Sequence, residues 1–544
     1  MDYATPLLAG FLTCIFLHKC PVRGDVALAI HMAILFGCYL IRFFDGYVER
    51  WQLLSDPLKT IFLHDSATTL TTIAYRVSPI HPLYRFPGPL IHKITSLQTA
   101  YIVYSGRRHL IVAGLHARYG KYVRIGPNTL SINSHVAVSP IYASTVPMDK
   151  SRAYQFGDAK GKGLFFMRKV EEHNGRRRQW AGAFSVHSLK EHKITLERRA
   201  FELVECIGMR HDGNGVVNLS QCLHHFAYDA MGDIVFGNSS RLDLMKEGDP
   251  EGLITSGQSA TIAFESLGEV PSLSEILWHL PVTDRLRRLE YYAGKLMTAR
   301  QNMDSCAEHH DLASHLLCAS DPSRQKLPPE DLRADALFAI QAGSDTPAGV
   351  LTFLFYFLLS HRDVYDKLRE ELDDHLSTQG EGFIDGTLDE LPYLNAVVNE
   401  TLRLGTPFGG FPRVVPQGGI VIDDQFIPQD TIVSVPTYTQ EISEENFWPE
   451  PLSFKPERWL PGGLGPGSRA RKSAIMAFSY GPFGCLGKSL AIHELLIVTA
   501  RLLLNYDLTL SASFDHEAFS AGVYNIRAAL FSYPLLVVAT RRRG

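Results

Sequence analysis

The sequence predicts a mainly α-helical protein with a small β region, attached to a membrane by its N-terminal segment. Three features predict this class. Helical runs start at Pro328 and at Lys488, a hairpin pattern with a Gly-Pro-Asn turn covers residues 119–132, and two apolar runs lie in the first 80 residues. We therefore expect an N-terminal membrane anchor region, residues 1–80, with one to three spans, and a second domain, residues 81–544.

Composition narrows the class of function. The chain has 544 residues, 45% of them hydrophobic, and a formal net charge of −4. Such a balance gives no support for nucleic-acid binding. The eight cysteines show neither CxxC pairs nor zinc-ligand spacing, which indicates a reducing compartment and a cytosol-facing domain.

The membrane segment is expected within residues 1–80. Val26–Phe44 is interrupted by His31 but is close to the roughly 20 apolar residues that a bilayer span requires, so it is the best candidate for a transmembrane helix. Ala4–His18 is short for a span, and no basic region precedes it, which favours an uncleaved anchor over a signal peptide. Leu58–Ile80 is either a surface-lying segment or a further span, and the flanking basic residues do not decide the number.

Basic residues and a capped helix mark the first half of the second domain. His173 and Arg177 are four residues apart, which puts both on one side of a helix. Arg177 belongs to a run of three arginines, Arg176–Arg178. The ordinary interpretation of such a run is a solvated surface. Further along, Tyr228–Gly237 has the pattern of an amphipathic helix that ends at a C-cap glycine.

A long helix is expected from Pro328-Pro329-Glu330, where proline is tolerated and the acid complements the helix dipole. Within it, Pro347 lacks the N–H that would bond the carbonyl of Gly343, so we expect a break in the helix and a groove beside Asp345 and Thr346. A carboxyl and a hydroxyl at a kink form a candidate proton relay. The alternative is a kinked core helix whose polar groups are satisfied internally.

A possible ion-pair cluster follows this helix. Glu400 and Arg403 lie one helical turn apart, but an exposed pair at this spacing contributes only about 0.3 kcal/mol and is common. The pair is therefore weak evidence by itself. The stretch Phe454-Lys-Pro-Glu-Arg458-Trp459 supplies a second arginine, Arg458.

The stretch that is most informative about chemistry is Phe478-Ser-Tyr-Gly-Pro-Phe-Gly-Cys485-Leu-Gly487, which precedes a helical run from Lys488 to Leu504. Its small residues describe a tight loop that presents one sulfur at a helix N-terminus and lets a flat ligand approach. The helix dipole and free N–H groups are expected to lower the pKa of the Cys485 thiol. One unpaired thiolate in such a loop suits an axial haem ligand, whereas most lone cysteines are inert core residues.

The loop fits FxxGxxxCxG, and AGxDT, ExxR and PERW stretches precede it in that order. In this combination the chain resembles the cytochrome P450 family, in its membrane-anchored fungal microsomal form, from the Phe86-Pro-Gly-Pro hinge onward. The resemblance implies the mainly α-helical P450 fold and haem b, iron protoporphyrin IX, as cofactor.

The resemblance also implies roles for individual residues. His173 stands where the family often has tryptophan, and Phe483 stands two residues before the cysteine, where the commonest loop has arginine or histidine. One propionate contact is therefore expected to be missing from the loop. The implied roles are iron ligation by Cys485, shielding of its sulfur by Phe478, a place for Gly487 in the haem loop, propionate contacts from His173, Arg177 and Arg413, a proton relay of Asp345 and Thr346, and a structural triad of Glu400, Arg403 and Arg458.

The implied function is a haem-thiolate monooxygenase that inserts one oxygen atom from O2 into a lipophilic small molecule. A terpenoid secondary metabolite is the first candidate substrate, and aromatic or polyketide compounds come next. No flavin or nicotinamide fingerprint is present in the sequence, so electrons are expected from a separate NADPH-cytochrome P450 reductase. Its docking face would draw on basic residues along the chain, namely Arg176, Arg178, Arg471, Lys472 and Lys488.

The expected location is the endoplasmic reticulum membrane, with the catalytic domain of residues 81–544 facing the cytosol. Two alternatives stay open at this point. One is a reductase-independent haem-thiolate isomerase or dehydratase, which would have no use for the Asp345 and Thr346 pair. The other is a non-catalytic membrane haem-binding protein.

Overall fold

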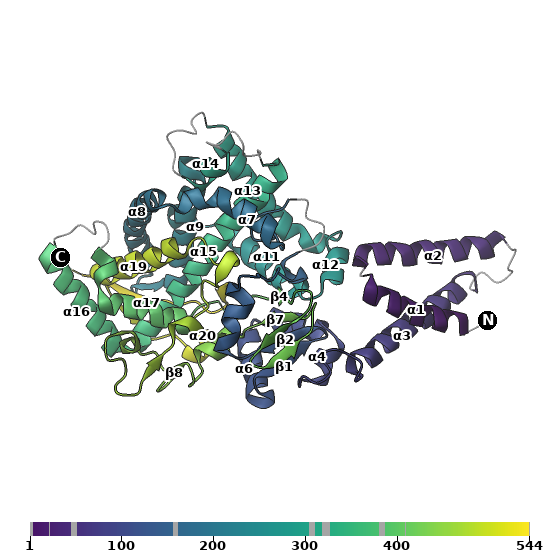
Figure 1. Cartoon of the computed structure of the whole chain (residues 1–544). Coiled ribbons are helices and arrows are strands. Elements are labelled where there is room, and N and C mark those ends of the chain that lie inside the picture. The colour runs from purple at the N-terminus through teal and green to yellow at the C-terminus, as the bar shows by residue number, and fades with distance from the viewer. Residues whose placement is uncertain are drawn as a thin grey trace.

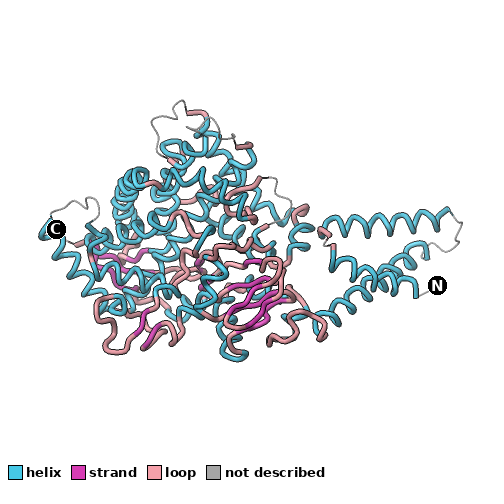
Figure 2. Tube along the Cα trace, in the orientation of Figure 1, coloured by secondary structure: helices cyan, strands magenta, loops and turns pink. Residues whose placement is uncertain are grey.

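The structure is a computed structural model that describes residues 4–20, 22–44, 52–155, 161–303, 311–317, 327–379, 387–407 and 410–542. A helical body carries a stalk of three helices that projects from one side (Figure 1). Helices make up most of the body, and the short strands gather in its lower part in this view (Figure 2). The prediction of a mainly α-helical fold with a small β region is confirmed.

The stalk consists of α1 (Ala4–Lys19), α2 (Gly24–Phe44) and α3 (Gln52–Val77). Within α2, Gly24–Ile41 has the length and apolar composition to cross a bilayer, and it can serve as the predicted anchor. In the described chain one further helix has such a composition, α15 (Pro329–Ser360), but 67% of its apolar window is buried within the body. That helix therefore belongs to the protein core.

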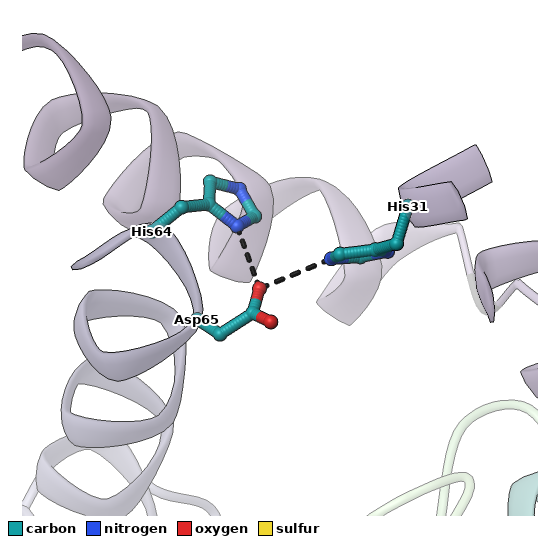
Figure 3. Close-up of side chains that lie close together, drawn as sticks. All are labelled: His31, His64 and Asp65. Carbon is teal, nitrogen blue, oxygen red and sulfur yellow. Dashed lines mark hydrogen bonds and ion pairs between the residues drawn. The ribbon is translucent and has the colours of Figure 1, made fainter. Parts of the chain in front are cut away.

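Polar side chains connect the three helices of the stalk, and Figure 3 shows those that join α2 to α3. Asp65 Oδ1 lies 3.0 Å from His31 Nε2 and 2.8 Å from His64 Nδ1, while His64 Nε2 lies 3.0 Å from Thr13 Oγ1. His31 Nδ1 also lies 2.8 Å from the carbonyl oxygen of Ala27, which can only accept. His31 thus connects its own helix to α3.

The stalk is fastened to the body at the start of α2. The backbone N–H of Gly24 donates to Glu275 Oε2 at 2.7 Å, in α12 (Pro271–Leu277), and Glu275 Oε1 accepts from Arg152 at 2.7 Å. Asp25 lies 3.2 Å from the ring of His279. A buried contact to Glu275 and an exposed contact to His279 thus join the start of α2 to the body.

The helices of the body begin and end at residues with suitable chemistry. Ser185 caps the N-terminus of α8 by accepting from the N–H of Ser188, and Asn218 caps α9 by accepting from Gln221 at 3.1 Å. The other helices are α4 (Leu90–Ile94), α5 (Leu97–Tyr104), α6 (Arg108–Tyr119), α7 (Val170–Ala181), α8 (Val186–Arg210), α9 (Leu219–Phe236), α10 (Leu244–Glu247), α11 (Leu253–Gly268), α13 (Asp284–Gln301), α14 (Leu312–Leu317), α16 (Arg362–Gln379), α17 (Pro392–Leu404), α18 (Thr437–Glu441), α19 (Lys488–Asn505) and α20 (His516–Ala521).

The core is built around α15, which packs against α9, α13, α17 and α19. Helix α9 is buried over nearly its whole surface, so the prediction of an amphipathic helix is wrong there, although it does end at the expected glycine, Gly237, with φ 58°. A helix enclosed by other helices needs no polar face. Helix α15 runs without interruption through Pro347, which differs from the expected break.

The strands form small sheets at the edge of the helical body. The largest has the order β1-β2-β7-β4, with β2 and β7 parallel and the other neighbours antiparallel. Its first two strands are the predicted hairpin. A second sheet has the order β10-β13-β3, and three pairs complete the set. The strands are β1 (Tyr122–Gly126), β2 (Thr129–Ile132), β3 (Val216–Asn218), β4 (Arg413–Val414), β5 (Ile420–Ile422), β6 (Gln425–Ile427), β7 (Ile432–Ser434), β8 (Phe447–Trp448), β9 (Arg469–Ala470), β10 (Tyr506–Leu510), β11 (Val523–Asn525), β12 (Ala529–Phe531) and β13 (Leu536–Arg541).

Candidate active site

Cys485 sits in a tight loop directly before α19. The N–H of Cys485 donates to the carbonyl oxygen of Phe478 at 2.9 Å, which closes the loop. Gly481 has φ 66°, and a Cβ at this position would lie 2.0 Å from the carbonyl oxygen of Tyr142, so only glycine fits. The loop therefore holds Cys485 in one position, and Cys485 lines an internal cavity.

The pKa of the Cys485 thiol differs from the expectation. Burial raises it, and the N–H of Gly487 together with the charges of Arg177 and Lys488 opposes that rise without overcoming it. This direction is opposite to the predicted lowering, because the helix N-terminus and the nearby charges do not outweigh the burial of the thiol.

The cavity has a volume of about 410 Å³, within the usual range for small-molecule sites. Phe478 and Gly487 lie in its wall on the side of Cys485. A Cβ added to Gly487 would lie 3.9 Å from the cysteine sulfur, so this position faces the space above the thiol. Thr406 also lines the cavity. The other walls are mainly apolar.

Positively charged side chains gather where the cysteine loop meets α7. Arg177 donates to the carbonyl oxygen of Gly484, and the guanidinium carbon of Arg413 lies 4.7 Å from the ring centroid of Phe483. The ring of His173 lies 4.5 Å from the same phenyl ring. Burial, followed by the charges of Lys150 and Arg177, lowers the pKa of His173 to about 3, so this histidine is neutral.

Asp345 and Thr346 reach the same cavity from α15. Asp345 is 1% exposed; its Oδ1 accepts from the hydroxyl of Tyr228 at 3.1 Å, and its Oδ2 accepts from Gln341. Burial raises the pKa of Asp345 to about 7, against the effect of both hydrogen bonds. The hydroxyl of Thr346 donates to the carbonyl oxygen of Ala342 at 2.7 Å. A carboxyl that changes protonation near neutral pH thus stands beside an alcohol.

Comparison with known proteins decides the family. The family model described as Cytochrome P450 matches residues 85–521, which is most of the chain.

The chain belongs to the cytochrome P450 family.

Curated relatives of this P450 are fungal monooxygenases, and the chain is accordingly a monooxygenase. It is 31% identical over 530 residues to cytochrome P450 monooxygenase nodW of Hypoxylon pulicicidum, covering 94% of this chain and 90% of the relative. It is 30% identical over 453 residues to cytochrome P450 monooxygenase AKT7 of Alternaria alternata, covering 80% and 86%. It is also 30% identical over 470 residues to tryprostatin B 6-hydroxylase of Aspergillus fumigatus, covering 83% and 81%.

The cavity of this P450 suits the haem that the family implies. Haem offers an iron that takes a thiolate ligand, a flat apolar ring and two carboxylates. The chain provides one thiol at a rigid loop, apolar walls, and three basic side chains beside that loop, namely Lys150, Arg177 and Arg413. The chemistry of the donor set therefore matches the cofactor.

Lys150 is a member of this basic group that sequence reasoning missed. Its ammonium lies 4.6 Å from the ring centroid of Phe483 and donates to the carbonyl oxygen of Phe165 at 2.8 Å. Burial and then Arg413 hold the pKa of Lys150 well below its usual range. The backbones of Lys150 and Arg413 form an isolated β-bridge between segments far apart in the sequence. No local sequence motif around Lys150 indicates this position.

The triad is a buried network in this P450. Glu400 and Arg403 are both fully buried, and Arg403 binds Glu400 through two nitrogens at 2.6 and 2.9 Å. Arg458 Nε lies 3.5 Å from Glu400 Oε1, and the indole N–H of Trp459 donates to Glu400 Oε2 at 2.9 Å. Arg403 also donates to the carbonyl oxygens of Glu441 and Ser453. One carboxylate thus ties α17 to the segment that leads to the cysteine loop.

One predicted member of the reductase face is not on the surface. Arg176 is 6% exposed, and its guanidinium binds Asp331 and Asp335 of α15, with 2.8 Å to Asp335. The prediction for Arg176 is therefore wrong. Arg178 is exposed, although it directly follows the cavity-lining Arg177 in α7. Lys472 and Lys488 are exposed as well.

Proposed function

We propose that this P450 hydroxylates a lipophilic secondary metabolite at the endoplasmic reticulum membrane, with electrons from NADPH-cytochrome P450 reductase. A terpenoid is the first candidate substrate, followed by aromatic and polyketide compounds. The single observation that carries the proposal is the shared cavity of Cys485 and the Asp345–Thr346 pair. The relative named as a tryprostatin B 6-hydroxylase supports hydroxylation as the reaction.

Each side chain has a role in holding the cofactor. Cys485 would ligate the iron, and Phe478 would cover the sulfur. Arg177, Arg413 and Lys150 would pair with the propionates, with His173 packed beside them. Bound haem supplies the iron at which O2 is reduced and divided, in the balance RH + O2 + 2e⁻ + 2H⁺ → ROH + H2O. Lys150 would compensate for Phe483, because its amine lies on the face of that phenyl ring and would take up a proton beside a propionate.

Asp345 would deliver the protons that this balance requires. Its carboxyl is held by Tyr228 and Gln341, so it cannot turn freely, and its pKa of about 7 allows it to lose and regain a proton at working pH. Thr346 would present its hydroxyl to the cavity after leaving the carbonyl oxygen of Ala342, which costs one intrahelical contact. Both groups stand on one rigid helix.

We expect Asp345→Asn to lower kcat by about 100-fold or more, because a positioned proton donor typically contributes 10²–10⁴-fold. In the wild type, the acid form dominates below pH 7 and the anion above it, because burial raises this pKa. Product formed per NADPH should therefore fall as pH rises through about 7, and the variant should lose this inflection. Stopped-flow and steady-state turnover across pH 6–8 measure both effects. An unchanged pH profile in Asp345→Asn would remove Asp345 from the relay.

A companion variant separates proton delivery from cofactor binding. Thr346→Ala should keep the haem spectrum of the wild type, since among the described residues the hydrogen bond of this hydroxyl goes to the carbonyl oxygen of Ala342. It should release hydrogen peroxide in place of product, because the alcohol of the relay is lost. Undiminished coupling in Thr346→Ala would count against a role for the hydroxyl.

The electron donor is inferred from the exposed basic residues Arg178, Lys472 and Lys488, which suit an acidic partner surface.

One experiment distinguishes the monooxygenase from the two alternative functions. Purified full-length protein is tested for its reduced-plus-CO spectrum and for turnover of a lipophilic library with reductase, NADPH and O2. Turnover with hydroperoxide alone would indicate an isomerase or dehydratase, and a normal spectrum without any turnover would indicate a non-catalytic haem protein.

A further inference from the structure

A buried ion pair lies in the cavity wall and is not used by the cysteine loop or the relay. Arg527, in the turn between β11 and β12, places a guanidinium nitrogen 2.8 Å from Oε1 of Glu265 in α11. The side chains are 13% and 3% exposed, and both residues line the cavity. Charged groups are rarely placed in an apolar wall without a function, because their desolvation is costly.

Three aromatic rings fix the orientation of Arg527. Its guanidinium carbon lies 4.2 Å from the ring centroid of Tyr154, 5.3 Å from that of Phe165 and 5.9 Å from that of Phe264. Phe165 and Phe264 also line the cavity. Stacking on several rings holds a cation in place without consuming its N–H donors.

Arg527 is a neighbour of the cysteine-loop basic group, because Lys150 and Arg413 lie against the same Tyr154 ring and Lys150 also lies against Phe165, but its ion-pair partner differs. Arg177, Arg413 and Lys150 each contact Phe483 or Gly484 of that loop, whereas Arg527 has its ion-pair contact with α11. It also has its own counter-ion. The neighbouring Glu269 is bound to Arg108 at 2.9 Å, so Glu265 is the carboxylate that balances Arg527.

The guanidinium retains unused hydrogen-bonding capacity. Within the described part of the chain, Arg527 Nε is buried without a hydrogen-bond partner, and the contact between its Nη1 and Glu265 lacks hydrogen-bond alignment. A buried donor left unsatisfied is costly. The 13% of the Arg527 side chain that stays exposed borders the cavity, and an oxygen atom of a molecule there would reach the guanidinium at that edge.

We propose that Arg527, balanced by Glu265, binds a neutral carbonyl or hydroxyl oxygen of the substrate. A neutral oxygen is favoured over a carboxylate, because Glu265 already neutralises the cation and would repel a second anion. This inference rests on the proposed function. It narrows the substrate class to a lipophilic molecule that arrives already carrying an oxygen function, which an earlier oxygenation or ring-forming step must supply.

The test uses rigid probes of one shape bound to the oxidised, full-length holoenzyme. Androstane, androstan-17-one and androstane-17β-carboxylic acid are titrated, and the substrate-induced change of the haem absorption gives each Kd. Wild type should bind the ketone about 10- to 100-fold more tightly than the hydrocarbon, as expected for one hydrogen bond from a charged donor. In Arg527→Leu this ratio should fall to about one. In Glu265→Gln the acid should gain about 10-fold relative to the ketone.

The control is Arg541→Leu, an exposed arginine on β13 that pairs with Glu205 at the surface, which should leave all ratios unchanged. Equal binding of ketone and hydrocarbon by wild type, or binding of neither, would overturn the inference. So would an undiminished ratio in Arg527→Leu. Arg527→Gln is prepared in parallel, and haem loss in both variants would also overturn it by assigning Arg527 to the haem. No reductase is used, so failed turnover would be a separate result that concerns the proposed function.

Discussion

Cys485→Ala is expected to abolish NADPH-dependent turnover and the ferrous–carbonyl absorption that is characteristic of thiolate ligation. The loop provides one sulfur at the cavity wall, and the described structure offers no second cysteine among the cavity-lining residues. An alanine leaves the loop geometry intact, because the closing contact runs from the backbone N–H of residue 485 to Phe478. Haem content by pyridine haemochrome and the reduced-plus-CO spectrum measure the effect.

The matched control is Cys20→Ala, an exposed cysteine in the stalk. It should retain both turnover and spectrum. If Cys485→Ala bound stoichiometric haem with the wild-type carbonyl absorption, the sulfur would not be the iron ligand, and the proposed function would lose its basis.

Glu400→Gln is expected to destabilise the fold by about 3–5 kcal/mol, which is typical when one partner of a buried ion pair is removed. The change leaves Arg403 and Arg458, 0% and 1% exposed in their side chains, without a compensating anion. The temperature of haem release and the denaturant midpoint of unfolding measure the loss, and a low yield of holoprotein should accompany it.

Asp366→Asn is the control for charge removal at the surface. Asp366 pairs with Arg362 at 2.9 Å, but the side chains are 59% and 46% exposed, and such pairs contribute at most about 1 kcal/mol. Equal losses in Glu400→Gln and Asp366→Asn would mean that the triad has no special structural weight.

Sequence patterns located the residues that belong to local motifs, but their surroundings depend on the fold. The arginine run of α7 shows the difference. Successive residues of a helix point about 100° apart, so Arg176 binds two aspartates of α15, Arg177 reaches the cysteine loop and Arg178 faces solvent. The sequence of the run could not show which of the three arginines is buried, which reaches the loop and which is exposed.

The energetic weight of the triad was equally hidden. Glu400 and Arg403 have the spacing of a common surface pair, and only the packing of α17 against the segment around Arg458 shows that both are enclosed. Burial is a property of the neighbours, and these come from residues more than 50 positions later in the chain.

Partners across long sequence separations were the residues that sequence reasoning missed. Tyr228 belongs to a helix for which the sequence predicted an apolar face and a terminal glycine but no contact with Asp345, yet its hydroxyl donates to that carboxylate 117 positions away. Lys150 and Arg527 lie in irregular segments that contain no recognisable motif. The role proposed for each depends on aromatic rings and charges that tertiary packing brings together. For these positions the three-dimensional structure is the first source of a signal.

The contact of Glu275 with Gly24 and Arg152 affects how the enzyme meets its substrate. Glu275 joins the start of α2 to α12, which follows the cavity-lining α11 in the chain, and Asp25 adds a contact with His279. Together these contacts would limit rotation of the body relative to the stalk. With the stalk inserted in lipid, the same flank would stay turned towards the bilayer. The substrate concentration that governs occupancy of the cavity would then be the concentration in the lipid phase. Compounds with low solubility in water would therefore saturate the enzyme at very low aqueous concentrations.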